Sequence, residues 1–386
     1  MFRSDLLRNS ETFILNQVQS LQRWQPVLAG NRRVAGGLPI ERVPIALPEP
    51  SSRLFQRIAL QVSRLANTRH RATESLLASL DPDLVHIHFG TDAVDAWPTV
   101  ARLAKPVVVT LHGYDVHIHR WWWEAGRGGT ARRFYPRRLL DLSGNRNVHF
   151  IAVSAAISAR AIDLGIPSSR ITTLHIGVDC ESFSPCRPIL DRRKRVLFVG
   201  RLVEKKGVEH LLRSFASIAP RVPDAVLTIA GDGPLRGNLE RLANSLSIPV
   251  EFTGAITANQ VRDHMRDSRV FCLPSITASN GDAEGFGLVL LEAQACGVPV
   301  VSSARGGSEE GMLDGETGFR VPEGGVDIMA EKLLLLLTDE ALASRMATRA
   351  RQFVSDRFDL EACTRSLEAF YDSVYEEHVR APCAAA

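Results

Sequence analysis

The run Val270-Phe271-Cys272-Leu273-Pro274, followed after a polar loop by Glu284-Gly285-Phe286-Gly287-Leu288, is typical of a buried strand that leads into a helix. Apolar runs of similar length recur along the chain, separated by segments long enough for helices. Such alternation predicts parallel sheets with helices on both faces, and therefore an α/β fold of the doubly wound type. The expected strands are 83–89, 106–112, 148–153, 171–176, 195–200, 225–230, 250–253, 270–273 and 298–302.

The 386 residues are enough for two such domains. The alternation is interrupted near 183–194, where Pro185, Pro188 and a charged Asp-Arg-Arg-Lys stretch occur. The first helix is expected to begin at 10–12, so Phe2–Leu7 can supply only a short first strand. We expect a first domain over 1–184, a hinge over 185–194, a second domain over 195–372, and a helix end and tail over 373–386.

Composition disfavours several classes of protein. Hydrophobic residues make up 45% of the chain and charged residues 23%, which is typical of a globular protein rather than a disordered one. No apolar run reaches the roughly 18 residues of a membrane-spanning helix, and the six cysteines form no Cys-x-x-Cys pair. A transmembrane protein, a disulfide framework and a structural zinc site are therefore disfavoured, and reduced thiols in a cytoplasmic protein are expected.

Charge is uneven along the chain. Residues 1–190 contain 23 Lys and Arg against 15 Asp and Glu, whereas residues 191–386 contain 23 against 28. Many basic residues of the first half lie on a helix expected over 51–80 or shortly after Trp121–Trp123; they are Arg53, Arg57, Arg64, Arg69, Arg71, Arg132, Arg133, Arg137 and Arg138. Arg beside Trp is typical of peripheral contact with an anionic membrane, although a solvated helix face beside an aromatic core gives the same pattern. No nucleic-acid-binding motif accompanies the charge, so nucleic acid is not an expected partner.

The loop before the helix at 288 is the strongest candidate for a ligand site. Gly285 and Gly287 permit close approach of the backbone, and the helix would direct its free N–H groups at an anion. Glu284 precedes this helix, and Glu292 lies about 12 Å further along its axis. The two carboxylates could therefore bind hydroxyls at opposite ends of an elongated ligand. Each of them taken alone also fits a helix cap or a surface position.

A second loop, Gly200-Arg201-Leu202-Val203-Glu204-Lys205-Lys206-Gly207, follows the expected strand at 195–200. Arg201 offers a bidentate fork and Lys206 a point charge, which suits phosphate recognition at the carboxyl edge of a sheet. The loop does not match the phosphate-binding pattern of nucleotide hydrolases, which requires Gly-x-x-x-x-Gly-Lys-Ser/Thr.

Histidines gather at the strand ends of the first half. His86 and His88 form a His-x-His pair, which invites a metal-site hypothesis. That hypothesis is disfavoured because both residues precede the strand end and no set of carboxylates completes a site. His112 is better placed, since it ends the strand at 106–112 and is followed by glycine, so its ring could face an inter-domain cleft.

In this order the motifs resemble the retaining glycosyltransferases of family 4, which have the two-domain GT-B fold. The resemblance covers nearly the whole chain. Its most specific parts are the Glu284…Glu292 spacing, the Gly-Arg-Leu…Lys-Lys-Gly loop at 200–207 and Leu-His-Gly-Tyr-Asp at 111–115. Ser10-Glu11-Thr12-Phe13-Ile14 is similar to a subset that builds bacterial exopolysaccharides of colanic-acid type. The resemblance implies two Rossmann-like domains that face a central cleft.

Roles for individual residues are also implied by the resemblance. Arg201 and Lys206 would bind the donor diphosphate and stabilise it as it leaves. Glu292 would hold the nucleotide ribose, Glu284 would contact the donor sugar, and His112 would line the reaction centre. The other implied positions are Gly285, Phe286, Gly287 and Leu288 for sugar and phosphate, and Asn9, Ser10 and Asp115 for the acceptor side. The Asn9-Ser10 loop lacks the glycines of many relatives, which weakens its expected contact with phosphate.

The implied reaction is hexosyl transfer, with retention, from a nucleotide-diphosphate sugar to a saccharide acceptor carried on a polyprenyl diphosphate. It would serve cell-surface polysaccharide synthesis at the inner face of the plasma membrane. No Asp-x-Asp ends a strand, so cationic side chains are expected in place of a metal ion, and no cofactor is expected. Two alternatives remain: a nucleotide-sugar 2-epimerase of similar fold, and a non-catalytic binding subunit of a polysaccharide assembly complex.

Overall fold

The computed structural model describes residues 1–48 and 53–380, with the side chains of all of these except 53–57. The chain forms two compact units: one contains Met1–Ile176 and the chain from Cys363 onward, and the other contains Gly177–Ala362. The division thus falls at 176/177, ahead of the hinge expected at 185–194. The last helix returns to the first unit, whereas the second domain was expected to extend to 372. Residues 381–386 of the expected tail lie outside the described part.

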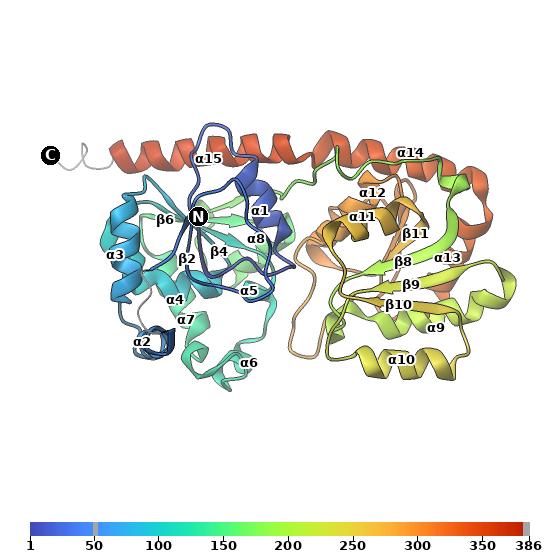
Figure 1. Cartoon of the computed structure of the whole chain (residues 1–386), viewed down its shortest axis with the longest axis horizontal. Helices are drawn as coiled ribbons and strands as arrows, with labels where there is room; N and C mark the ends of the chain where they lie inside the picture. Colours follow the sequence, from blue (N-terminus) through green and yellow to red (C-terminus); the bar gives the residue numbers. More distant parts are fainter. Residues whose placement is uncertain (49–52, 381–386) are drawn as a thin grey trace. The chain divides into compact units, whose positions relative to one another are not determined.

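In the described part of the first unit (Figure 1), seven parallel strands form one sheet, and their order is β3-β2-β1-β4-β5-β6-β7. The strands are β1 Phe2–Leu6, β2 Leu28–Arg33, β3 Ile45–Ala46, β4 Val85–His88, β5 Val107–Leu111, β6 Val148–Ala152 and β7 Ile171–Thr173. The helices are α1 Thr12–Gln19, α2 Arg53–Ala66, α3 Arg71–Leu80, α4 Gly90–Val100, α5 Tyr114–His117, α6 Arg120–Glu124, α7 Tyr135–Ser143, α8 Ala155–Asp163 and α15 Leu360–Arg380.

The short first strand lies in the interior of this sheet. β1 pairs with β2 on one side and with β4 on the other. Its charged Arg3 is buried because two carboxylates neutralise it, with Glu11 at 2.5 Å and Asp92 at 2.6 Å. A strand interrupted by charge can therefore occupy the middle of a sheet when carboxylates are buried beside it.

The single helix expected over 51–80 is wrong, because the segment forms α2 and α3. Asn67 has a φ of +52°, in the left-handed region, where an α-helix ends. The Thr68 N–H then bonds back to the Ser63 carbonyl at 2.9 Å and completes the helix end. β2 and β3 were not expected either, since β2 ends in Asn31-Arg32-Arg33 and β3 spans only two residues.

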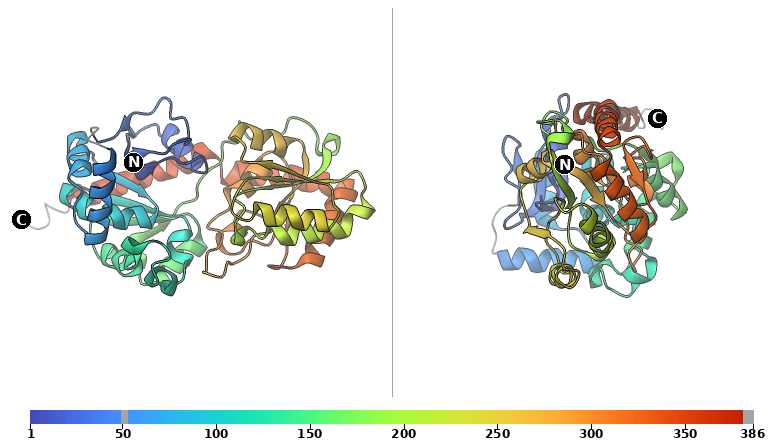
Figure 2. Two further views of the ribbon diagram at one scale, coloured as in Figure 1. Left: turned by 60° about the horizontal axis from the view of Figure 1, so that its bottom comes forward. Right: turned by 90° about the vertical axis from the view of Figure 1, so that its right-hand side faces the viewer.

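In the second unit, the described residues form a six-stranded parallel sheet in the order β10-β9-β8-β11-β12-β13. The strands are β8 Arg193–Val199, β9 Val226–Ala230, β10 Val250–Gly254, β11 Ser268–Leu273, β12 Val300–Ser302 and β13 Gly318–Arg320. The helices are α9 Val208–Ile218, α10 Arg236–Ser245, α11 Ala258–Arg266, α12 Leu288–Ala295, α13 Val326–Thr338 and α14 Glu340–Arg357. Helix α9 packs with α10 and α13 on one face, and α12 packs with α11 and α14 on the other (Figures 1 and 2).

The prediction of two doubly wound α/β units is confirmed by these topologies. Every strand expected from the sequence overlaps an observed strand. In both sheets the strand order reverses beside the first strand, between β1 and β4 and between β8 and β11. Ligands of doubly wound sheets bind outside the carboxyl ends of the strands at this point of reversal. The loops after β8 and β11 are those in which the sequence places its strongest candidate residues.

Candidate functional site

Charged residues of a short 3-10 turn after β8, Glu204–Lys206, hold the loop that follows β11. Glu204 accepts hydrogen bonds from the backbone N–H of Ser279 at 2.8 Å and from its hydroxyl at 3.0 Å. The Lys205 ammonium lies 3.0 Å from a carboxylate oxygen of Asp282. Hydrogen bonds and an ion pair from these side chains therefore hold the loop after β8 against the loop after β11.

Backbone contact brings the same loops together. Gly207 has a φ of +57°, and a Cβ at this position would lie 2.0 Å from the carbonyl oxygen of Pro274. Gly287, with a φ of +76°, is the N-cap of α12, and its added Cβ would lie 2.9 Å from the Ser308 hydroxyl. Both positions require glycine, for conformation and for space.

Lys206 and Glu284 form the centre of this site. The Lys206 Nζ lies 2.6 Å from Glu284 Oε1, and Ser275 donates a hydrogen bond to the same oxygen at 3.1 Å. Burial by itself would raise the pKa of Glu284, but the charges of Lys206 and Lys205 and the hydrogen bonds from Lys206 and Ser275 outweigh it and lower the pKa to about 2. Glu284 is therefore ionised at neutral pH and accepts hydrogen bonds. The sequence did not point to Ser275, which comes directly after the proline that ends β11.

Arg201 differs from the other charged residues of its loop. Its side chain is exposed and makes no hydrogen bond or ion pair with any residue that the structure describes. Glu204, Lys205 and Lys206 are each held by the loop after β11. Arg201 is therefore the cation of this loop that is free to bind an anion arriving at the sheet edge.

Helix α12 begins at Leu288, as expected, and its first N–H groups have no partner within the helix. Phe286 is buried against Phe358, with ring centroids 5.5 Å apart, so this residue contributes packing as well as backbone. Glu292 lies on the second turn of α12 and is half-buried. Burial raises its pKa to about 7, since it forms no ion pair with any described residue. The two carboxylates predicted from the sequence thus have opposite pKa shifts.

In the first unit, His112 follows β5, at the carboxyl edge of the sheet. The rings of Phe13 and Phe89 flank it, with centroids 5.1 and 4.4 Å away. Its Nε2 lies 3.1 Å from Nδ1 of His88. Burial, and after it the charge of Arg3, lowers the pKa of His112 to about 3. The imidazole is therefore neutral in the physiological range and can act as a polar donor or acceptor.

Asp115 supports the loop that carries His112. Its Oδ2 accepts a hydrogen bond from the His112 backbone N–H at 2.8 Å. Asp115 is buried on α5, and burial raises its pKa to about 6 in spite of backbone hydrogen bonds that act in the opposite direction. Asn9 and Ser10 lie in an exposed turn between β1 and α1.

His86 and His88 belong to the sheet core. Both are buried on β4, and His86 bonds to Tyr371 on one ring nitrogen and to Thr110 on the other. Among the described residues, no three His, Cys, Asp or Glu side chains are grouped so that they could hold a metal ion. Cys180, Cys186, Cys272 and Cys296 carry free thiols, and Cys383 lies outside the described residues.

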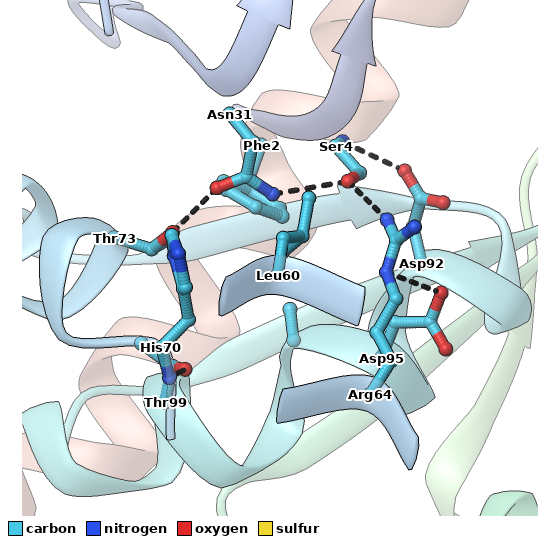
Figure 3. Close-up of a pocket in the computed structure, with 11 residues that line it drawn as sticks. Phe2, Ser4, Asn31, Leu60, Arg64, His70, Thr73, Asp92, Asp95 and Thr99 are labelled. Atoms are coloured by element: carbon cyan, nitrogen blue, oxygen red, sulfur yellow. Dashed lines mark hydrogen bonds and ion pairs between the residues drawn. The ribbon is translucent and has the colours of Figure 1, made fainter. Parts of the chain in front are cut away.

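A polar cluster that the sequence did not indicate joins β1 and β2 to helices α2 and α3 (Figure 3). Arg64 reaches the hydroxyl of Ser4 and lies 3.3 Å from a carboxylate oxygen of Asp95, while Asn31 bridges Ser4 and Thr73. The cavity that these residues line has a volume of about 10 Å³, the space of about one water molecule. The cluster therefore holds the helices to the sheet and is too small for a substrate.

The expected basic and aromatic surface is only partly formed. Trp123 is buried, whereas Trp121 and Phe134 are exposed. Arg64 and Arg132 turn inward and both pair with Asp95. The side chains of Arg53 and Arg57 lie outside the described residues. No helix in the described part of the chain is long and apolar enough to cross a membrane.

Comparisons with known proteins agree with this architecture. A family model described as Glycosyltransferase Family 4 matches residues 12–182, and one described as Glycosyl transferases group 1 matches residues 183–353. The GDP-mannose-dependent alpha-(1-6)-phosphatidylinositol monomannoside mannosyltransferase of Mycolicibacterium smegmatis is 33% identical over 66% of this chain and 67% of its own length. The amylovoran biosynthesis glycosyltransferase AmsK of Erwinia amylovora is 27% identical over 81% of this chain and 74% of its own.

Solved structures share the fold. The structure of Anabaena Alr3699/HepE in complex with UDP and glucose superposes with a TM-score of 0.75 and 19% identity, over 96% of this chain and 98% of that one. Two doubly wound units of this kind, matched by both family models, define a glycosyltransferase of the GT-B type. The chain belongs to glycosyltransferase family 4, which confirms the resemblance noted from the sequence.

Proposed function

We propose that the protein transfers a hexosyl group, with retention and without a metal ion, from a nucleotide-diphosphate sugar to a lipid-linked saccharide in cell-surface polysaccharide synthesis. The observation that carries this proposal is the set of groups at the point of reversal of the second sheet. An unpartnered cation, Arg201, a lysine held on a carboxylate, Lys206–Glu284, and the start of α12 all follow neighbouring strands there.

The charges fit the demands of glycosyl transfer. As the bond to the donor breaks, positive charge develops on the sugar and negative charge on the leaving diphosphate. Arg201, Lys206 and the N–H groups at the start of α12 supply positive charge for the diphosphate. These are the groups that would take the place of a divalent cation.

The ionised Glu284 suits the sugar side of the reaction. With its pKa held at about 2 it has no proton to give, so it accepts hydrogen bonds from sugar hydroxyls and favours positive charge on the ring. In a retaining transfer, the acceptor hydroxyl attacks on the face that the diphosphate leaves. The proton of that hydroxyl then passes to the departing phosphate oxygen, and no protein base is needed.

Donor class is supported by the relatives. The mycobacterial relatives are named for GDP-mannose, and the Anabaena structure contains UDP and glucose. The first test is thermal unfolding of the purified protein with UDP, GDP, ADP and their sugar conjugates. A nucleotide at about 100 times its Kd stabilises the native state by roughly 2.7 kcal/mol and should raise Tm by a few degrees. Absence of a shift with every nucleotide would contradict the donor site.

Two variants separate binding from transfer. Arg201→Ala should weaken nucleotide binding by roughly 10- to 100-fold, because a charged hydrogen bond to phosphate contributes about 1.5–3 kcal/mol. Glu284→Gln should abolish transfer and leave nucleotide binding near the parental value. Arg213→Ala, an exposed arginine of α9 outside both loops, is the matched control. Full turnover in Glu284→Gln would overturn the assignment of the site.

The acceptor side of the proposal rests on an exposed apolar surface of the first unit. Ile58, Val62 and Leu65 are each more than half exposed, and their spacing of four and three residues places them on one face of α2. The exposed rings of Trp121 and Phe134 each have a guanidinium within 6 Å, from Arg127 and Arg138 respectively. Apolar side chains bordered by arginines fit the headgroup region of an anionic membrane.

Sedimentation with lipid vesicles tests this surface. The protein should bind vesicles that contain anionic lipid, bind neutral vesicles less, and lose binding as salt is raised. The triple change of Ile58, Val62 and Leu65 to Ser should reduce binding several-fold, whereas Ile328→Ser, at an exposed position of α13 in the second unit, should not. Equal binding to neutral and anionic vesicles would contradict the proposal.

A further inference from the structure

Three histidine rings lie in a row in the first unit, from β4 to the end of β5. The rings of His86 and His88 are stacked with centroids 4.4 Å apart, and those of His88 and His112 with centroids 5.3 Å apart. A hydrogen bond of 3.1 Å joins Nδ1 of His88 to Nε2 of His112. Because one of these nitrogens must donate and the other accept, the proton of His88 decides which nitrogen of His112 carries a proton.

The first ring of the row is fixed on both sides. Both nitrogens of His86 have partners, the Tyr371 hydroxyl from α15 and the Thr110 hydroxyl on β5. His88 packs against this ring inside the sheet core, so its own ring is held in one orientation. Its Nδ1 is thereby directed at His112.

The surroundings of the other ring nitrogen, Nε2, show whether His88 carries its proton on Nδ1 or on Nε2. His88 is fully buried, and its Nε2 has no hydrogen-bond partner among the described residues. A proton on Nε2 would bury an N–H group with no acceptor, which is among the rarest features of native structures. A proton on Nδ1 instead lets the ring donate to His112 and leaves only a lone pair without a partner.

The tautomer of His88 determines the tautomer of His112. With Nε2 accepting from His88, the neutral His112 ring carries its proton on Nδ1. This nitrogen makes no hydrogen bond with any residue that the structure describes, and the ring is half-buried. Nδ1 is therefore available to a ligand, and it can donate a hydrogen bond but not accept one.

We propose that His88 is a positioning residue that holds His112 as the Nδ1–H tautomer, so that His112 offers a hydrogen-bond donor, and no acceptor, to an oxygen of a sugar substrate. The proposal rests on the proposed sugar transfer and on the role in it that the family resemblance implies for His112. In this arrangement His112 cannot take a proton from the acceptor hydroxyl, which agrees with a transfer in which the departing phosphate receives it.

Nitrogen NMR of the whole protein, labelled with ¹⁵N-histidine, tests the tautomer without reference to activity. Protonated and unprotonated ring nitrogens differ widely in chemical shift, and the signals that vanish in His112→Asn are those of His112. The expected result is a protonated Nδ1 and an unprotonated Nε2 on His112 at neutral pH. A protonated Nε2 on His112 in the parent protein overturns the proposal.

Two substitutions of His88 extend the test. His88→Asn places an amide N–H close to the position of Nδ1 and should keep both the tautomer and most of the activity. His88→Leu removes the donor, and it should shift His112 toward the Nε2–H form and lower kcat about 10-fold with KM for the nucleotide sugar little changed. An unaltered His112 tautomer in His88→Leu contradicts the positioning role, whether or not activity falls.

His112→Ala separates this inference from the proposed function. If transfer is unaffected in His112→Ala, the role of His112 at the reaction centre fails, while the tautomer measurement still decides the role of His88. If His112→Ala loses transfer and the parent protein shows the Nε2–H tautomer, the proposed function stands and only the inference about His88 fails.

Discussion

At the scale of single residues, the second unit contains two carboxylates whose pKa values are shifted in opposite directions, although burial by itself raises the pKa of both. Glu284 has cations beside it and its pKa is lowered to about 2, whereas Glu292 has none and its pKa is raised to about 7. The same residue type on one loop and helix therefore differs in charge at neutral pH. The difference comes from Lys206, which lies 2.6 Å from Glu284.

Lys206→Met should destabilise the protein by about 3 kcal/mol at pH 7, because it leaves a buried carboxylate without its partner. The pKa of Glu284 is lowered on folding, so the stability that the pair contributes is present above the pKa of the unfolded chain, about 4.3. That contribution is lost as the pH falls toward 2, and the difference between variant and parent should shrink there. Urea unfolding of the variant and the parent at pH 7 and at pH 3 measures the difference in stability at each pH.

Lys194→Met is the matched control for Lys206→Met. Lys194 pairs with Asp224 at 3.0 Å, but Lys194 is only half-buried and Asp224 is exposed, so the loss of this pair should leave the urea midpoint nearly unchanged. A Lys206→Met variant as stable as Lys194→Met at pH 7 would show that Glu284 finds another partner.

Glu292→Gln should stabilise the protein at pH 8 and have little effect at pH 5. The pKa of Glu292 is raised on folding, so its favourable contribution is present at low pH and is lost as the pH rises through about 7. Since the side chain is half-buried, we expect a gain of about 1–2 kcal/mol at pH 8. Nucleotide binding should weaken in the same variant, because a carboxylate accepts ribose hydroxyls better than an amide does. In urea unfolding, a larger gain of Glu292→Gln over the parent at pH 5 than at pH 8 would contradict this sign.

At the scale of elements, the site depends on how closely the backbone segments after β8 and β11 approach each other. Gly207→Ala should destabilise the protein by about 3 kcal/mol, because its Cβ would lie 2.0 Å from the Pro274 carbonyl oxygen at a φ of +57°. Gly237→Ala on α10 has nothing within 4 Å of the new Cβ and should stabilise the protein by about 0.5–1 kcal/mol. Chemical unfolding measures the change in the free energy of unfolding for each variant, which should be a loss for Gly207→Ala and a gain for Gly237→Ala. If Gly207→Ala left the free energy of unfolding unchanged, the loops after β8 and β11 could move apart without loss of stability, which would contradict the prediction.

The elements also show what the sequence could predict. Alternating apolar runs were enough to find most of the strands, because a parallel strand buried on both faces is apolar throughout. The same reasoning gave too little weight to β1. Its Arg3 is neutralised by Glu11, which is 8 residues away, and by Asp92, which is 89 residues away and becomes a neighbour only in the folded unit. The same reasoning also merged α2 and α3, since a left-handed Asn67 leaves no mark in hydrophobic periodicity.

The candidate site was predictable to a similar extent. Glycines, cations and carboxylates beside strand ends show in the sequence, and Glu284 and Lys206 do come together. The hydrogen bond between Ser279 and Glu204 and the ion pair between Lys205 and Asp282 were not predictable, because they depend on the path of a polar loop. The orientation of His112 depends on His88 one strand away, a contact that spacing alone does not reveal.

At the scale of the whole molecule, the chain leaves the first unit, builds the second from Gly177–Ala362, and returns to the first through α15. Leu367, Tyr371 and Val374 of α15 pack against Val108 and Ile151 of the first sheet. Glu368 accepts hydrogen bonds from the backbone N–H groups of residues 22–24. The end of the sequence therefore completes the core of the unit that the start of the sequence builds.

Removal of the chain after Ala362 should accordingly abolish sugar transfer and spare nucleotide binding. Each lost apolar side chain costs about 2–5 kcal/mol, and together they approach the whole stability of a domain. The first unit should unfold, while the second keeps both loops of the donor site. Calorimetric titration measures nucleotide binding, with the nucleotide that thermal unfolding identifies as a ligand. A transfer assay measures sugar transfer. Leu367→Ala should give a partial loss of transfer, and Val379→Ala, exposed on the same helix, should give none. Loss of nucleotide binding on truncation would show that the second unit requires the first for its fold.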